Sequence, residues 1–286
     1  MKVLYILNES SLYMQMAWYS IYTLRKHNKY IPIEILYICD KGRDNRLIDD
    51  KNLIDLKINP FCKDSFVESC QQFNVTFVFV YNLDMKEETG FHSLQRMAFQ
   101  YVEDDQILLL DADTFLFGDV EPFFQVLRHN DVVLDLNAWG RYGFRLPYKG
   151  HNILSVNSGV VLLNKGILKE YGKQVYDLSM KIKGEDDPIG KWLSEYQIYE
   201  GTEGKLCREE IAFSLFLHDN KIKFRLSYPN EIQTNNIRNK TLIHHTQIQS
   251  YFRYWKKYYD KDFSFPMTKI KCKYFTKTYI KHEKEK

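Results

Sequence analysis

The chain has 286 residues, 44% of them hydrophobic and 15% aromatic, which is enough for a large packed core and excludes an intrinsically disordered protein. The formal net charge of +3 excludes a strongly acidic or basic protein, although the charge is unevenly spread. Residues 251–286 hold eleven Lys/Arg and four Asp/Glu. We therefore expect a main domain over 1–250 and a basic, aromatic C-terminal extension over 251–286 that packs on it or trails from it.

The five cysteines show no C-x-x-C spacing, and their odd number does not suggest a disulfide framework or a structural zinc site. The opening run, MKVLYILNES, is far too short to span a bilayer and indicates a first strand rather than a signal peptide or anchor. These features predict a soluble, cytoplasmic protein with no transmembrane segment.

Short apolar runs alternate with segments of helical spacing along the chain. The runs at 2–7, 33–38, 76–80, 106–110, 132–134 and 160–163 predict buried strands. Apolar residues recur at helical spacing over 13–24 and over 94–101. Strand–helix alternation with nearly continuous apolar strands predicts an α/β fold whose largely parallel central sheet has helices on both faces.

Polar residues follow several of these runs, among them Asn8, Asp111 and Asp135. In open parallel sheets the ligand crevice lies at the carboxyl ends of the strands. A single Asn or Asp at such a position is equally explained as a turn or cap residue. The segment ILLLDADTFLF is different, because it ends a strand with two aspartates and a cap needs only one carboxylate.

Asp111 and Asp113 are two residues apart, so on an extended chain their side chains point to the same side. Two close carboxylates in an apolar setting would normally force one of them to hold a proton. A divalent cation removes this conflict, because Mg²⁺ or Mn²⁺ prefers oxygen ligands and is often held by carboxylates together with substrate phosphates. The motif predicts a metal site at which the ion stabilises the charge on a leaving diphosphate.

Four sequence blocks carry a family resemblance by their order and spacing: KVLYILNESSLYMQMAWYSIYTL at the start, SLQRMAFQYVEDDQILLLDADTFLFGDV in the middle, NSGVVLLNKG at 157–166 and LIHHTQ at 242–247. With them, residues 1–250 resemble the GT-A-fold nucleotide-sugar glycosyltransferases, particularly the group that includes glycogenin and related galactosyl- and glucosyltransferases. The resemblance implies a Rossmann-like GT-A fold, a UDP-sugar donor, and an oligosaccharide or glycan acceptor.

The resemblance also implies site residues. Asp113 would chelate the metal, Asp111 would touch the metal or the donor ribose, and His244 would be the third protein ligand. On an extended segment the neighbouring His245 would point to the opposite side, so only one of the two histidines should be a ligand. Contacts to the nucleotide-sugar would come from six further residues: Asn8, Tyr13, Arg96, Asn157, Ser158 and Gly159. The family's phosphate-holding lysine after the histidine has no counterpart in TQIQSYFRYW.

A second carboxylate pair, Glu209 and Glu210, opens the apolar segment 207–217. The helix dipole favours acidic residues in a first turn, so a purely structural explanation stays open. The resemblance implies that the pair faces the acceptor, where inverting members use one glutamate to take the proton from the attacking hydroxyl. Retaining members use the position only to orient the acceptor. The pair favours inversion, whereas the glycogenin-like blocks favour retention. Asp135 would contact the transferred sugar.

Two other functions fit parts of the sequence. LLLDADT also matches the signature of haloacid-dehalogenase-like phosphohydrolases, but that family carries the motif near its N-terminus and has a later acidic pair after an apolar strand. The acidic pairs at 185–187 and 260–262 lack that strand. The other alternative is a non-catalytic nucleotide-sugar- or glycan-binding protein. We expect no nucleic-acid partner, and at most a weak contact of the basic tail with a membrane surface.

Overall fold

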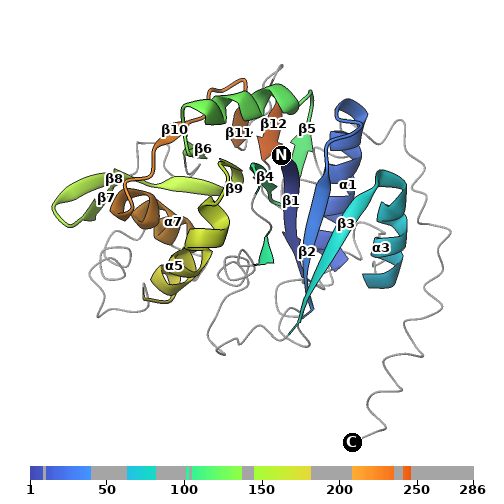
Figure 1. The fold of residues 1–286 in the computed structure, drawn as a ribbon, viewed down its shortest axis with the longest axis horizontal. Coiled ribbons are helices and arrows are strands. Elements are labelled where there is room, and N and C mark those ends of the chain that lie inside the picture. The colour runs from blue at the N-terminus through green and yellow to red at the C-terminus, as the bar shows by residue number, and fades with distance from the viewer. Residues whose placement is uncertain are drawn as a thin grey trace, which may run out of the picture.

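The structure is a computed structural model that describes residues 1–8, 11–39, 63–81, 101–102, 105–136, 145–181, 208–234 and 241–245. Within these ranges the chain forms a seven-stranded sheet, a three-stranded sheet and a two-stranded hairpin, with helices on both faces of the largest sheet (Figure 1). The helical spacing at 94–98 and the extension at 251–286 lie outside the described residues. The domain boundary at residue 250 therefore stays a prediction.

The largest sheet has the strand order β10-β6-β9-β4-β1-β2-β3. Four neighbouring strands run parallel: β4 (Ile107–Leu110), β1 (Lys2–Leu7), β2 (Ile33–Cys39) and β3 (Val75–Tyr81). β9 (Val156–Leu163) runs antiparallel both to β4 and to β6 (Val132–Leu136), and β10 (Phe224–Leu226) pairs with β6 in parallel. The expected α/β fold with a largely parallel central sheet is confirmed.

The observed strands overlap the predicted ones, and the largest difference is at β9. This strand begins at Val156 rather than at residue 160, because its pairing with β6 extends to Val156, and the polar Asn157 and Ser158 are buried within it. Its direction has the larger consequence. Since β9 is antiparallel to β4, the amino end of β9 lies at the same edge of the sheet as the carboxyl ends of β1 and β4.

Alternate side chains of β1 point into two different cores. Tyr5 and Leu7 pack into the cluster that contains α1 (Ser11–His27), whereas Leu4 packs into the cluster that contains α7 (Arg208–Asp219). Every residue of β1 is therefore buried, as in a sheet covered on both faces. The residues at the carboxyl ends of β1 and β4 therefore lie between two packed layers.

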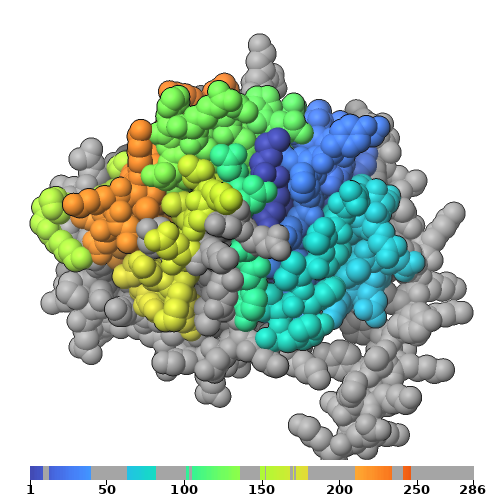
Figure 2. Space-filling view, viewed as in Figure 1, coloured from blue at the N-terminus to red at the C-terminus, as the bar shows by residue number. Residues whose placement is uncertain are grey.

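The helices form the two covering layers. α1 contacts α3 (Lys63–Cys70) and the short 3-10 helix η1 (Gln71–Phe73), while a second 3-10 helix, η3 (Glu121–Arg128), contacts β6 and β9. On the other face α5 (Ile167–Lys181) packs against α7, and the two lie side by side in the space-filling view (Figure 2). Among the described residues, none of the helices combines the length and the hydropathy that crossing a membrane requires.

The three-stranded sheet brings the last described segment back to the middle of the molecule. β12 (Ile243–His245) pairs antiparallel with β5 (Thr114–Leu116) and parallel with β11 (Ile232–Thr234). β5 follows the two aspartates directly in the chain. This small sheet therefore places residues 242–245, the described part of the LIHHTQ block, beside the D-A-D motif.

The hairpin of β7 (Arg145–Tyr148) and β8 (His151–Leu154) lies at the far end of the molecule, next to α7 (Figure 1). Its two turn residues, Lys149 and Gly150, have φ values of 48° and 79°. Positive φ at both central residues is the geometry of a type I′ turn, whose twist matches that of the flanking strands.

Candidate functional site

Asp111 and Asp113 lie in the turn between β4 and β5. The backbone N–H of Asp111 donates to the Gly159 carbonyl at 2.7 Å, which continues the pairing of β4 with β9. The Thr114 hydroxyl donates to the Asp111 carbonyl at 2.9 Å. The two carboxylates converge because the chain turns between them, whereas the sequence suggested convergence on an extended segment.

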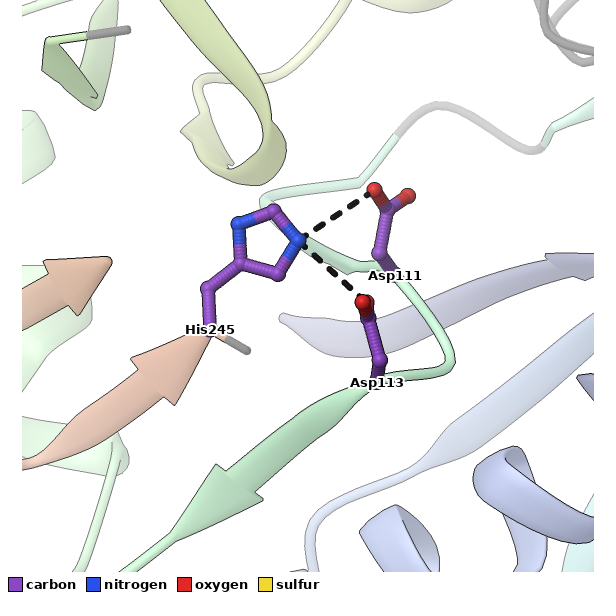
Figure 3. A group of neighbouring side chains, drawn as sticks. All are labelled: Asp111, Asp113 and His245. Atoms are coloured by element: carbon purple, nitrogen blue, oxygen red, sulfur yellow. Dashed lines mark ion pairs between the residues drawn. The ribbon is translucent and has the colours of Figure 1, made fainter. Parts of the chain in front are cut away.

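The imidazole of His245 completes a group with the two aspartates (Figure 3). Its Nε2 atom lies 3.2 Å from Asp113 Oδ1 and 3.6 Å from Asp111 Oδ2. One potential ligand atom from each of the three residues lies within 4.8 Å of the others. The group therefore joins the turn after β4 to the end of β12, two segments that are far apart in the sequence.

The electrostatics of the group centre on His245. Burial alone lowers the pKa of this imidazole, but the carboxylates of Asp113, Asp111 and Glu210 outweigh burial and raise the pKa to about 9. With this raised pKa the ring of the metal-free protein is an imidazolium at neutral pH, and its single positive charge offsets part of the charge of the two aspartates. A bound divalent cation would take over this role, and the ring would release its proton on binding the ion.

The group suits a hard divalent cation in both ligand type and spacing. Carboxylates are the preferred ligands of Mg²⁺ and Mn²⁺, and imidazole is acceptable to Mn²⁺. Neighbouring ligands of an octahedral ion at about 2.1 Å lie about 3 Å apart. The distances of 3.2 Å and 3.6 Å from His245 Nε2 to the two carboxylates are close to this spacing. Three protein ligands would leave coordination positions for substrate oxygens.

Gly159 provides the space that the group occupies. A Cβ atom at this position would collide with the imidazole of His245 and would lie 2.6 Å from Asp111 Oδ2. Gly159 is not among the glycines with a positive φ. Glycine is therefore required here by lack of space and not by an unusual backbone conformation. We call the space between Gly159, His245 and Asp111 the metal cradle, and any larger residue at position 159 would fill it.

The histidine beside the aspartates is His245, whereas the sequence resemblance pointed to His244. In the antiparallel pair of β12 and β5, His244 lies opposite Phe115 and His245 lies opposite Thr114. Opposed residues point to the same face of a sheet, so His244 shares the face of the buried Phe115 ring. Burial, together with the charge on His245, lowers the pKa of His244 to about 4. The candidate metal ligand is therefore His245 and not His244.

Asn157 and Glu210 lie beside the group and connect β9 to α7. Asn157 Nδ2 donates to Glu210 Oε1 at 3.0 Å, and Asn157 Oδ1 accepts the backbone N–H of Gly159 at 3.0 Å. These two bonds fix the orientation of the amide. Glu210 is 9% exposed, and its charge contributes to the raised pKa of His245. A buried carboxylate is therefore held near the candidate metal group.

Ser214, one helical turn after Glu210, was not singled out from the sequence. Its Oγ donates to the Glu210 carbonyl at 2.7 Å and accepts the backbone N–H of Val156 at 3.1 Å. It therefore ties the first turn of α7 to the start of β9. The spacing of four residues between Glu210 and Ser214 is visible in the sequence, but the strand that they face is not.

Three other predicted residues lie at the same edge of the sheet. Asn8 follows β1 and is buried, and Ser158 is buried within β9. Asp135 lies near the end of β6, where it is half-buried and accepts a hydrogen bond from Ser227 Oγ at 3.4 Å. Their positions bring them to the edge that holds the aspartates, while their roles stay predictions.

The remaining predicted residues are placed less directly. Tyr13 is half-buried in the first turn of α1 and packs against the core. Glu209 lies in α7, but its side chain lies outside the described part of the structure, as does Arg96. Contacts of these three residues with a nucleotide-sugar or an acceptor therefore stay predictions.

No protein-family model and no curated protein matches the chain. Among solved structures, the chain is similar to the galactosyltransferase LgtC in complex with donor and acceptor sugar analogs, with 11% identity over 86% of this chain and 87% of that chain and a TM-score of 0.48. It is also similar to the glycosyltransferase GlyE of Streptococcus pneumoniae TIGR4, with 15% identity over 85% of this chain and 54% of that chain and a TM-score of 0.46. For the bifunctional glycosyltransferase WbbM the identity is 10%, the coverages are 85% and 45%, and the TM-score is 0.46.

Proposed function

We propose that the chain is a metal-dependent glycosyltransferase that moves a glucosyl, galactosyl or xylosyl group from a UDP-sugar to a carbohydrate acceptor. The observation that carries this proposal is the group of Asp111, Asp113 and His245 at the edge of the sheet, beside Glu210. Its ligand set, in a cradle kept open by Gly159, suits an ion that also binds a diphosphate. The sequence blocks that resemble nucleotide-sugar glycosyltransferases support the same class of donor.

The metal would be Mn²⁺ or Mg²⁺, held by Asp111, Asp113 and His245. When bound, such an ion offsets the negative charge that develops on the leaving diphosphate. The side chain of Asp111 would also contact the donor ribose. We propose seven further residues as contacts of the donor: Asn8, Tyr13, Arg96, Asp135, Asn157, Ser158 and Gly159.

Glu210 is the candidate general base. As an acceptor hydroxyl oxygen bonds to the anomeric carbon of the sugar, the bond from that carbon to UDP breaks and the hydroxyl proton moves to the Glu210 carboxylate. Attack from the face opposite UDP inverts the anomeric configuration. Asn157 would orient the carboxylate for this step through its 3.0 Å hydrogen bond. In a retaining reaction Glu210, or its neighbour Glu209, would only orient the acceptor.

A panel of UDP- and GDP-sugars, incubated with oligosaccharide acceptors with and without Mn²⁺, tests the proposal through the release of free nucleotide. We expect UDP release that requires both the ion and an acceptor and that is lost in Asp113→Asn. The anomeric configuration of the product, read by NMR, decides between inversion and retention.

The same assay separates the alternatives. Tight donor binding without nucleotide release would favour a non-catalytic nucleotide-sugar-binding protein. Phosphate release from a phosphomonoester without an acceptor would favour a phosphohydrolase, the alternative suggested by the LLLDADT segment.

A further inference from the structure

One side of α1 carries two buried polar residues, Ser20 and Thr23, and a third, Asn28, follows the helix directly; they are 0%, 1% and 2% exposed. Each of them hydrogen-bonds to the segment 114–120, which follows the two aspartates immediately. A helix that only covers a sheet needs apolar residues on that side. These polar residues therefore serve to bind the segment 114–120 and not only to cover the sheet.

The first contact is a chain of hydroxyl groups with one direction. Tyr5 Oη lies 2.8 Å from Ser20 Oγ, and Ser20 Oγ lies 2.7 Å from Thr114 Oγ1. The single hydroxyl hydrogen of Thr114 is donated to the Asp111 carbonyl at 2.9 Å. Thr114 must therefore accept from Ser20, and Ser20 must accept from Tyr5. In this series of three hydroxyl groups each one donates to the next, and the last donates to the Asp111 carbonyl.

The second and third contacts hold the backbone further along. Thr23 Oγ1 accepts the backbone N–H of Leu116 at 3.1 Å. Asn28 binds the chain on both sides, because its Nδ2 donates to the Gly118 carbonyl at 3.0 Å and its Oδ1 accepts the Val120 N–H at 2.7 Å. α1 therefore fixes the segment from the metal-binding turn through β5 to the start of the next helix.

We propose that Ser20, Thr23 and Asn28, together with Thr114, are positioning residues that set the affinity of the site for its ion, an inference that rests on the metal site proposed above. Buried hydrogen-bonding groups are costly to leave unpaired, so this set of bonds confines the turn to one geometry. One of these bonds joins the Thr114 hydroxyl to the Asp111 carbonyl and so closes the turn that contains Asp113. Partners that orient the ligands of a metal typically change its affinity by about 10- to 100-fold.

Two substitutions in the hydroxyl chain test the proposal with the full-length protein and Mn²⁺ alone. Thr114→Val keeps the shape of the side chain but removes its hydroxyl, and Ser20→Ala removes the donor to Thr114. Binding is followed by the loss of the free Mn²⁺ signal in electron paramagnetic resonance. We expect the Mn²⁺ affinity to fall about tenfold in Thr114→Val and several-fold in Ser20→Ala. Thr114→Ser, which retains the hydroxyl, should restore the affinity.

Ser179→Ala is the matched control. Ser179 is buried in α5, and its hydroxyl donates to the Tyr176 carbonyl at 2.7 Å, so its loss removes one buried hydrogen bond away from the turn. Thermal unfolding measured for each variant shows the loss of stability, and only the turn variants should also lose Mn²⁺ affinity. An equal loss of affinity in Ser179→Ala would overturn the proposal, because affinity would then follow general stability.

The remaining outcomes are also decisive. Wild-type affinity in both Thr114→Val and Ser20→Ala would overturn the positioning role while leaving the metal site in place. If Thr114→Val does not fold, Ser20→Ala decides by the same criterion. Failure of the metal site itself gives a different result: wild-type protein would then bind no Mn²⁺, or Asp113→Asn would bind it equally well, and both results would overturn this inference together with the proposed function.

Discussion

The side-chain amide of Asn157 donates to Glu210 Oε1 at 3.0 Å, which links the start of β9 to the first turn of α7. The same amide accepts the N–H of Gly159, the residue that leaves room for the metal group. The candidate base and the candidate metal cradle are therefore joined through one asparagine, so a substitution at Glu210 that is meant to test the base must keep the oxygen that accepts from Asn157.

Glu210→Gln should separate the charge of this side chain from its shape. A glutamine oxygen can still accept from Asn157, but the amide cannot take a proton from an acceptor hydroxyl. If the reaction inverts, we expect UDP release to fall by about 10²–10⁴-fold, with Mn²⁺ binding retained. Steady-state nucleotide release and Mn²⁺ titration measure the two effects. Full activity in this variant would exclude Glu210 as the base and would leave it only a role in orienting the acceptor.

Gly159→Ala should close the metal cradle. The added Cβ would meet the His245 ring and Asp111 Oδ2, so the group must separate, and we expect the Mn²⁺ affinity to fall by about tenfold or more. Gly118→Ala is the control, because the nearest atom to its Cβ would be the flexible end of Leu242, at 3.0 Å. Equal Mn²⁺ affinity in both variants, measured by titration, would contradict the location of the site.

Binding of the ion should stabilise the folded protein. Mn²⁺ at 100 times its dissociation constant would add about 2.7 kcal/mol to the free energy of unfolding if the ion binds only the folded chain. The expected result is a rise of several degrees in the melting temperature, reversed by a chelator. Asp113→Asn, which removes one ligand charge, should show no such rise. An equal rise in this variant would mean that the stabilising ion binds elsewhere.

The two histidines should make the stability of the metal-free protein depend on pH in opposite directions. His245 has a pKa of about 9 in the folded state, raised from 6.5, so its contribution is complete below pH 6.5 and is lost as the pH rises through 9. His244 has a pKa of about 4, lowered from 6.5, so its contribution is lost as the pH falls from 6.5 through 4. For these two groups, the free energy of unfolding should be largest near pH 6.5.

Urea unfolding in the presence of a chelator, repeated across the pH range, measures this dependence. His245→Gln should remove the decrease between pH 6.5 and 9 and leave the decrease on the acid side. Saturating Mn²⁺ should also flatten the alkaline side, because the ion replaces the proton on His245. An unchanged alkaline slope in His245→Gln would show that other groups dominate the titration.

The sequence predicted most of the central sheet, because buried strands of an α/β fold are nearly continuous apolar runs. It did not show the direction of β9, since the run VVLL has the same character in a parallel and in an antiparallel strand. Direction is decided by the pairing of β9 with β4 and β6. That pairing explains why Gly159, before the apolar run rather than after it, lies beside Asp111, with Asn157 hydrogen-bonded to it.

The site was predictable where residue types carry the chemistry. Two aspartates, two residues apart after an apolar strand, indicated a metal group from residue type and spacing. The choice between His244 and His245 depends on the register of β12 against β5, which neighbouring positions in a sequence cannot reveal. The roles of Ser20 and Thr23 were not visible either, because small hydroxyl residues in an apolar helix look unremarkable until the chain that they contact is placed.

His245 belongs to the smaller sheet, whereas Asp111 directly follows β4, a strand of the larger one. An ion bound by these residues would link the two sheets. Separation of β12 from β5 would then require the ion to dissociate. A strand of three residues has few bonds of its own to resist such fraying. Binding of the ion would then slow amide hydrogen exchange in β12, and the exchange rate of this segment would report whether the proposed metal site is occupied.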